Sequence, residues 1–163
     1  MALILLLTSL LIELKPYPAN GWGLDVYETA PASVAAMISV GVSAGVLFAL
    51  YKVLPLFSDL LTSIAVVGGI TFLVSNVIGL RQDNVKRLLG YSSIGQVGLL
   101  AMALALLQQY GQNAHLGMIV GGLFLNHLLA KAGLFWLAGT VQRESIKEWS
   151  ALAGKPWVLL RFG

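Results

Sequence analysis

A lysine stands near the middle of an apolar stretch that is long enough to cross a lipid bilayer. The stretch runs from Leu116 to Val141, and Lys131 is its one formally charged residue. About 20 apolar residues are enough for a helix to span the hydrocarbon core. An amine at that depth costs roughly 2.5–3.5 kcal/mol on insertion scales, so such residues usually face a bundle interior and mark ion or proton pathways. We therefore expect Lys131 to face the interior, near a polar group of a neighbouring span.

A histidine shares the helix face of this lysine. His127 precedes Lys131 by four residues, and positions i and i+4 lie side by side on a helix. An imidazole titrates near neutral pH, which suits a proton shuttle. The alternative for His127 is a hydrogen bond to a backbone carbonyl of a neighbouring helix. The pair indicates that the protein moves protons or cations.

The composition is that of a membrane protein. Hydrophobic residues make up 58% of the 163 residues and charged residues only 10%, whereas soluble domains average roughly 25% charged. The chain has no cysteine, which excludes disulfides, thiolate metal sites and cysteine nucleophiles. The net charge of +3 comes from basic residues dispersed among apolar runs, so we expect no nucleic-acid partner.

The apolar runs predict an all-α polytopic transmembrane helix bundle, a single membrane domain over residues 1–163. We place about five spans at residues 2–14, 31–54, 57–80, 85–108 and 116–141, followed by a cytoplasmic amphipathic segment at 142–153. The first run is short for a complete crossing. Because Lys15–Thr29 is rich in Pro, Gly and Asn, we predict a loop there.

The basic residues set the expected orientation. If the spans alternate, one side carries only Lys52. The other side carries Lys15, Arg81, Lys86, Arg87, Arg143, Lys147, Lys155 and Arg161. Basic residues favour the cytoplasm, so the loop Lys15–Thr29, the turn after residue 80 and the C-terminal segment are predicted to be cytoplasmic. The N-terminus would then lie outside, which with the short first run favours a piece of a longer protein.

Three motifs resemble those of one family. Residues 22–31 read WGLDVYETAP, residues 83–98 read DNVKRLLGYSSIGQVG and residues 126–135 read NHLLAKAGLF. In this order they are similar to motifs of the antiporter-like membrane subunits of respiratory complex I, group 4 membrane hydrogenases and multisubunit cation/proton antiporters. The resemblance is closest to the complex I subunit of N type. It covers nearly all of this chain but only a central fragment of a family member, whose larger fold is built of inverted repeats.

The resemblance implies proton (or Na⁺/H⁺) translocation within a multisubunit redox-driven pump or antiporter. Lys131 corresponds to a central lysine of the family, and His127 would be its relay in a chain of buried polar residues. The family usually has a lysine midway along the helix that matches the second span, and Ser43 stands there instead. Ser39 and Ser43 would hold water in its place. This departure leaves an alternative open, a non-conducting structural or assembly subunit with the same fold.

Charged residues near the predicted cytoplasmic surface are further candidates. Lys86 with Asp83 would take up protons, or Lys86 would simply anchor a helix start in the cytoplasm. For Asp25 and Glu28 the resemblance suggests gating or subunit contact. The alternative is a pair of solvated acids that cap a helix start.

No redox chemistry is expected in this chain. The sequence has no cysteine cluster, glycine-rich nucleotide loop or haem ligand pair, so we expect no cofactor, no metal and no catalytic site. If the host complex is an NADH- or ferredoxin-quinone oxidoreductase or a membrane hydrogenase, its electron chemistry would belong to partner subunits. The expected partners are other membrane subunits, lipid, and protons or Na⁺, with any quinone held by a neighbouring subunit. The expected location is a bacterial or archaeal cytoplasmic membrane, or an organellar inner membrane.

Overall fold

The computed structural model describes residues 1–111 and 114–152, and these residues form helices with no strand. The all-α prediction is confirmed. In chain order the helices, two of which are a π-helical turn (η1) and a 3₁₀ turn (η2), are α1 (Ala2–Glu13), α2 (Gly21–Thr29), α3 (Ala32–Met37), η1 (Ile38–Val42), α4 (Ser43–Val53), η2 (Leu54–Leu60), α5 (Leu61–Gly79), α6 (Val85–Gln109), α7 (Ala114–Val141) and α8 (Ile146–Leu152).

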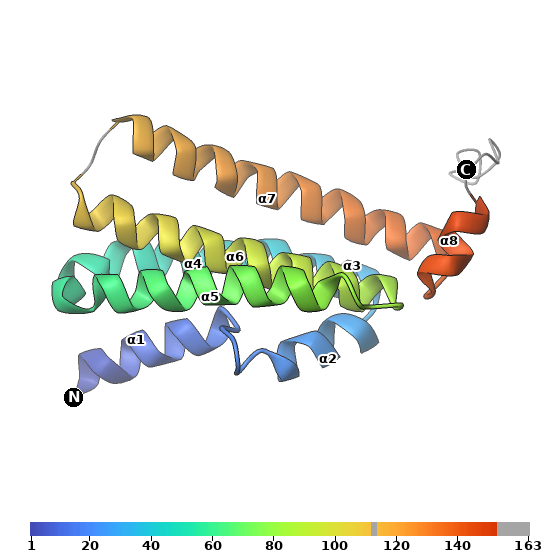
Figure 1. Cartoon of the computed structure of the whole chain (residues 1–163), viewed down its shortest axis with the longest axis horizontal. Helices are drawn as coiled ribbons and strands as arrows, with labels where there is room; N and C mark the ends of the chain where they lie inside the picture. The colour runs from blue at the N-terminus through green and yellow to red at the C-terminus, as the bar shows by residue number, and fades with distance from the viewer. Residues whose placement is uncertain (112–113, 153–163) are drawn as a thin grey trace.

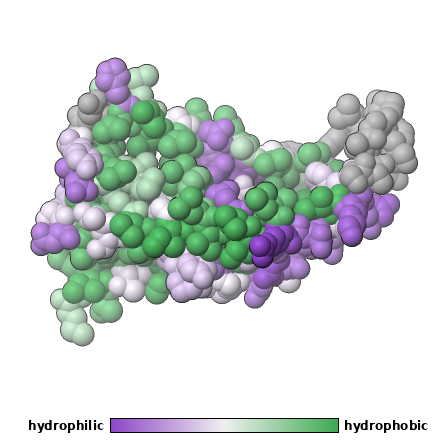
Figure 2. Space-filling model, viewed as in Figure 1, coloured by the Kyte–Doolittle hydropathy of each residue, from purple (hydrophilic) through white to green (hydrophobic). Residues whose placement is uncertain are grey.

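Three of the described helical stretches are long and apolar enough to cross a membrane, at Ala32–Gly79, Val85–Gln109 and Ala114–Val141. The first stretch reverses direction at η2, where Phe57 leaves helical geometry with φ −126° and ψ 41°. As a result, α4 and α5 run in opposite directions (Figure 1). Hydrophobic residues cover much of the face in Figure 2, and hydrophilic residues lie toward both ends, with the larger share at the end that carries α8. An apolar surface of this kind is suited to lipid and to other apolar helices.

Helices α5 and α6 form the closest contact in the bundle. A Cβ placed on Gly68 of α5 would lie 2.5 Å from the carbonyl oxygen of Gly98 on α6. Glycine at both positions therefore lets the two backbones meet, as is common where membrane helices cross. The contact fixes α6 beside α5, and α6 is the helix that carries most of the polar partners described below.

The predicted loop Lys15–Thr29 differs from the observed structure. It is a loop only as far as Asn20, and α2 follows α1 along the length of the bundle (Figure 1). The backbone N–H of Tyr17 donates to Thr71 Oγ1 at 3.1 Å, near the middle of α5. The break thus lies beside the middle of a spanning helix, and Lys15 is only 2% exposed. Its assignment to the cytoplasmic surface is wrong, because the prolines interrupt the helix within the bundle instead of at the membrane surface.

The turn between α5 and α6 lies at the same end as the C-terminal segment. Val85 N–H donates to the Glu144 carbonyl at 2.8 Å, and Ile146 N–H donates to the Asp83 carbonyl at 2.9 Å. Asn84 caps α6 through its side-chain oxygen, which accepts from Arg87 N–H at 3.0 Å. The predicted amphipathic segment contains α8. Its last residue, 153, lies outside the described residues, as do Lys155 and Arg161.

Candidate functional site: a buried polar chain

Lys131 lies inside the bundle. Its residue is 1% exposed, and its Nζ donates a hydrogen bond of 2.7 Å to Ser92 Oγ on α6. The i, i+4 spacing on α7 turns Lys131 and His127 toward the same helix, α6. The polar group of a neighbouring span that was expected near Lys131 is the hydroxyl of Ser92. The hydroxyl of Ser92 is the acceptor for the Lys131 amine, and the rest of the lysine is buried.

His127 joins α7 to two other helices. The residue is 1% exposed. Its Nδ1 is 3.0 Å from Gln96 Oε1 on α6, and its Nε2 is 3.1 Å from the backbone carbonyl oxygen of Ser39. Ser39 belongs to the π-helical turn η1, and π-turns widen a helix locally and often occur at functional sites. His127 therefore contacts a carbonyl of a neighbouring helix, as the alternative predicted, and also a side chain that is able to change its hydrogen bond.

Hydroxyl groups gather next to the imidazole. Ser39 Oγ and Ser93 Oγ are 2.6 Å apart, and Ser43 Oγ donates to the Ile38 carbonyl at 3.3 Å. The phenol of Tyr27, from α2, has the hydroxyls of Ser93, Ser39 and Ser43 as polar neighbours. We call Tyr27, Ser39, Ser43 and Ser93 the hydroxyl cluster. Hydroxyl groups both donate and accept, so the cluster provides a continuous set of hydrogen-bonding positions between α2 and His127.

The tyrosine is held in place by packing. Its ring stacks on Phe135 of α7 with the centroids 5.6 Å apart. On its other side, a Cβ on Gly90 would lie 2.9–3.2 Å from three Tyr27 carbons, so only glycine leaves room there. The residue is fully buried, with 1% exposure. The position of the phenol is therefore set by α6 and α7 together.

A second buried lysine lies at the break between α1 and α2. Lys15 Nζ donates to the Glu13 carbonyl at 2.7 Å, pairs with Glu13 Oε1 at 3.3 Å and lies 4.8 Å from the centre of the Trp22 ring. Lys15 has a left-handed backbone with φ 59°, which is uncommon for a non-glycine residue. Its alkyl chain crosses Gly23, where a Cβ would lie 3.0 Å from Cγ and Cε. We call Glu13, Lys15, Trp22 and Gly23 the helix-break site.

Charged groups fasten α2 to the start of α6. Arg87 Nη1 bonds Asp25 Oδ1 at 3.1 Å and also pairs with Glu28 Oε2. Lys86 Nζ donates to the Ala30 carbonyl at 3.3 Å, at the end of α2. Asp83, the predicted partner of Lys86 in proton uptake, is exposed at this end. Arg87 and Lys86 thus join the start of α6 to α2 at one end of the bundle.

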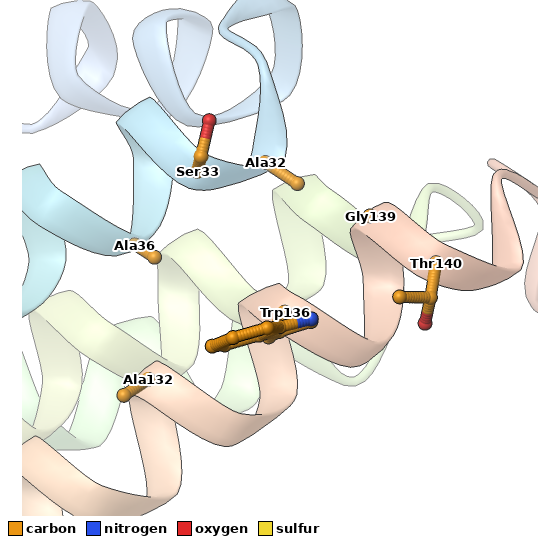
Figure 3. A pocket seen from close by; sticks show the side chains of 7 residues that line it. All are labelled: Ala32, Ser33, Ala36, Ala132, Trp136, Gly139 and Thr140. Atoms are coloured by element: carbon orange, nitrogen blue, oxygen red, sulfur yellow. The ribbon is translucent and has the colours of Figure 1, made fainter. Parts of the chain in front are cut away.

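A cavity of about 230 Å³ opens at that end. Its polar lining comes from both the start of α6 and the segment after α7, and the full set is Ala32, Lys86, Ala138, Gly139, Gln142, Arg143 and Glu144. A larger groove of about 520 Å³ lies between α3 and α7 (Figure 3). Its walls are mostly small residues, with the ring of Trp136 on the α7 side. None of the residues predicted to carry ions lines this groove.

Comparison with known proteins decides the family. Residues 1–155 match the family model described as NADH:quinone oxidoreductase/Mrp antiporter, TM. This chain belongs to that family. The NADH-quinone oxidoreductase subunit N of Magnetococcus marinus is 32% identical over 95% of this chain and 33% of its own length. The NAD(P)H-quinone oxidoreductase subunit 2 of Crocosphaera subtropica is 29% identical over 94% of this chain and 30% of its own length.

A solved structure has the same fold as this antiporter-family chain. It is a chain of the membrane-bound sulfane sulfur reductase, an archaeal respiratory membrane complex, with a TM-score of 0.76 and 30% identity over 93% of this chain and 32% of that one. The resemblance to the complex I subunit of N type is confirmed. The chain spans about a third of the length of these relatives. It is an integral membrane protein, as the family and the apolar helices require.

Within this antiporter-family chain, the structure divides the predicted residues into two groups. Lys131, His127, Ser39 and Ser43 meet in the interior around α6. The other predicted residues lie at the end of the bundle where α2 meets the start of α6. They are Lys86, Asp83, Asp25 and Glu28.

For this antiporter-family chain, sequence reasoning gave Gln96 only a role in ordering water along its span and grouped Tyr27 with the charged loop residues Asp25 and Glu28, and it used Lys15 only to count charges. Tyr27 and Gln96 each stand inside a recognised motif, which was the available signal. For Lys15 the signal was a lysine directly before Pro16, in a run too short to cross the membrane. Such a pattern is also what a helix interrupted within the membrane would give, as in transporters with discontinuous helices.

Proposed function

We propose that this chain belongs to a membrane subunit that translocates protons, or exchanges Na⁺ for protons, within a multisubunit complex of the complex I type. The observation that carries the proposal is the buried amine of Lys131, bonded to Ser92 on a neighbouring helix and placed one helical turn from His127. Ionisable groups held inside membrane helices are characteristic of proton relays. The subunit would act together with other membrane subunits that carry the redox chemistry.

The relay would run through the polar groups in the interior. From Lys131 it passes to Nδ1 of His127, on the same helix face, and from there through bridging water to the hydroxyl cluster and to Tyr27. Past Tyr27, the buried lysine of the helix-break site would continue the relay toward α1. Water molecules would complete the spaces between these groups, because proton transfer needs hydrogen-bonded neighbours.

The test is to change the lysine and follow pumping in the assembled complex. Lys131→Ala removes the relay amine together with the cost of burying it, so assembly should persist while ion pumping falls at least tenfold relative to electron transfer. Lys131→Arg keeps the charge but does not release a proton at any useful pH. A relay lysine therefore fails as arginine too. Lys52→Ala, which removes a lysine at the far end of α4, is the control and should pump normally.

A non-conducting structural role is the second candidate, and one feature favours it. Ser43 stands where the family usually has a lysine, and no ionisable residue lies in α5. Full pumping by both Lys131→Ala and Lys131→Arg, measured by dye quenching in proteoliposomes at an unchanged electron-transfer rate, would establish that role and refute translocation through this chain.

A further inference from the structure

The hydrogen bonds of His127 require a particular arrangement of protons. Its Nε2 faces the carbonyl oxygen of Ser39, which only accepts, so Nε2 must carry a hydrogen in both charge states. The variable proton is therefore the one on Nδ1. That nitrogen faces the side-chain amide of Gln96 at 3.0 Å. When Nδ1 is bare it needs a donor, and when it is protonated it needs an acceptor.

We propose that Gln96 is a positioning residue whose amide rotates as His127 gains and loses its proton, so that both charge states of the histidine are hydrogen-bonded in the interior. This inference rests on the proposed function, which uses His127 as the relay. With neutral His127, Gln96 donates through Nε2–H to Nδ1. With protonated His127, Gln96 accepts through Oε1, the arrangement in which Nδ1 and Oε1 face one another.

A glutamine is suited to this task for a simple reason. A buried donor or acceptor that loses its partner costs roughly 1–3 kcal/mol, and more when it is charged. A fixed acceptor at this position would hold His127 in its charged state, and a fixed donor would hold it neutral. The amide offers one of each at nearly equal distances from Cγ. Rotation by half a turn therefore exchanges the two states without moving the helices.

The surroundings contain few other groups that would set the charge of His127. Lys131, one turn along α7, is the charged neighbour, and its own hydrogen bond goes to Ser92. Tyr27 is the titratable group that reaches the same serines from α2. No carboxylate bonds His127 among the residues that the structure describes. The amide of Gln96 is thus the partner that responds directly to the proton on Nδ1.

The test uses two variants of similar size in the full complex. Gln96→Glu provides only an acceptor with a negative charge, so His127 would hold its proton to higher pH. Gln96→Met provides no acceptor for Nδ1–H, so His127 would take a proton only at lower pH. Proton pumping per electron is measured in proteoliposomes from pH 5.5 to 9. We expect the optimum to move up by about one pH unit or more for Gln96→Glu, the size typical of an adjacent opposite charge, and down for Gln96→Met.

The controls lie on the same helix. Gln109, at the end of α6, donates to Thr62 Oγ1 and has no contact with His127, so Gln109→Glu and Gln109→Met should keep the optimum of the unmodified complex. If Gln96 only packs, Gln96→Met would lower pumping equally at all pH values and leave the optimum in place. Unmoved optima, or optima that move in the same direction, overturn the inference. If Gln96→Glu fails to assemble, Gln96→Met decides alone.

The two proposals fail in different ways. If Lys131→Ala pumps normally, the proposed function is wrong whatever the Gln96 variants do. If Lys131→Ala stops pumping while both Gln96 optima stay in place, the relay stands and only the role of Gln96 is refuted.

Discussion

Replacement of Gly23 by alanine tests whether the helix-break site needs the path that Lys15 takes. A Cβ on Gly23 would lie 3.0 Å from Cγ and Cε of Lys15 and closer still to the carbon between them. Ordinary contacts between carbons are about 3.5–4.0 Å. The Lys15 side chain is held at one end by its backbone and at the other by the contacts of its ammonium group. Its alkyl chain would therefore have to move away from Gly23. The ammonium would then lose Glu13 and Trp22.

The magnitude follows from those contacts. A hydrogen bond to a charged group contributes roughly 1.5–3 kcal/mol, and a lysine over an aromatic ring about 0.5–2 kcal/mol. Alanine favours a helix over glycine by about 1 kcal/mol. The net loss of stability for Gly23→Ala is therefore about 1–4 kcal/mol.

Gly21→Ala is the matched control, because a Cβ at Gly21 would meet nothing within 4 Å in the same short helix. The assay heats the solubilised complex in steps and follows its disassembly on native gels, together with pumping in proteoliposomes. We expect Gly23→Ala to disassemble at a lower temperature and to pump less, and Gly21→Ala to match or exceed the unmodified complex. Equal stability and pumping in the two variants would show that Lys15 does not depend on the space beside Gly23.

Three further outcomes are expected. Gly68→Ala should destabilise the complex by about 1–3 kcal/mol, because its Cβ meets the α6 backbone. Gly69→Ala should not, because its Cβ meets only the flexible end of a methionine. Equal disassembly temperatures for the two variants would contradict this. Tyr27→Phe should change stability by only about 1 kcal/mol yet reduce pumping, and normal pumping would remove the phenol from the relay. Arg87→Gln should lower the disassembly temperature at low salt and change it little at high salt, because salt screens the partly exposed pairs with Asp25 and Glu28. An equal loss of disassembly temperature at both salt concentrations would show that packing and not charge is responsible.

Much of the fold could be predicted from the apolar runs. The periods and lengths of α5, α6 and α7 are strong local signals, because a helix that crosses lipid must satisfy its backbone internally and be apolar over about 20 residues. The turn formers after α1 and the count of basic residues predict a loop at the membrane surface there. Where the backbone is interrupted beside other helices, as at Lys15 and Tyr17 against Thr71, the local sequence looks the same. Only contacts with α5 distinguish the two cases.

The site was predictable to a similar extent. The charge of Lys131 and its spacing from His127 were enough to place both on one inward face, since the cost of an exposed amine in lipid leaves few other arrangements. Their partners were not predictable in this way. Gln96 and Ser92 are ordinary polar residues of a membrane helix, and Ser39 contributes a backbone carbonyl, which every residue has.

The sequence by itself therefore determined that the chain is a bundle of membrane helices with an ionisable pair on an inward face of α7, because hydrophobicity and helical spacing are properties of neighbouring residues. The tertiary structure decided which groups those side chains meet. His127 and Ser39 are 88 residues apart, Lys131 and Ser92 are 39 apart, and Ser39 and Ser93 are 54 apart. Hydrogen bonds need donor and acceptor within about 3 Å, and only the packing of α7, α6 and η1 on one another brings residues this distant in the chain to that separation.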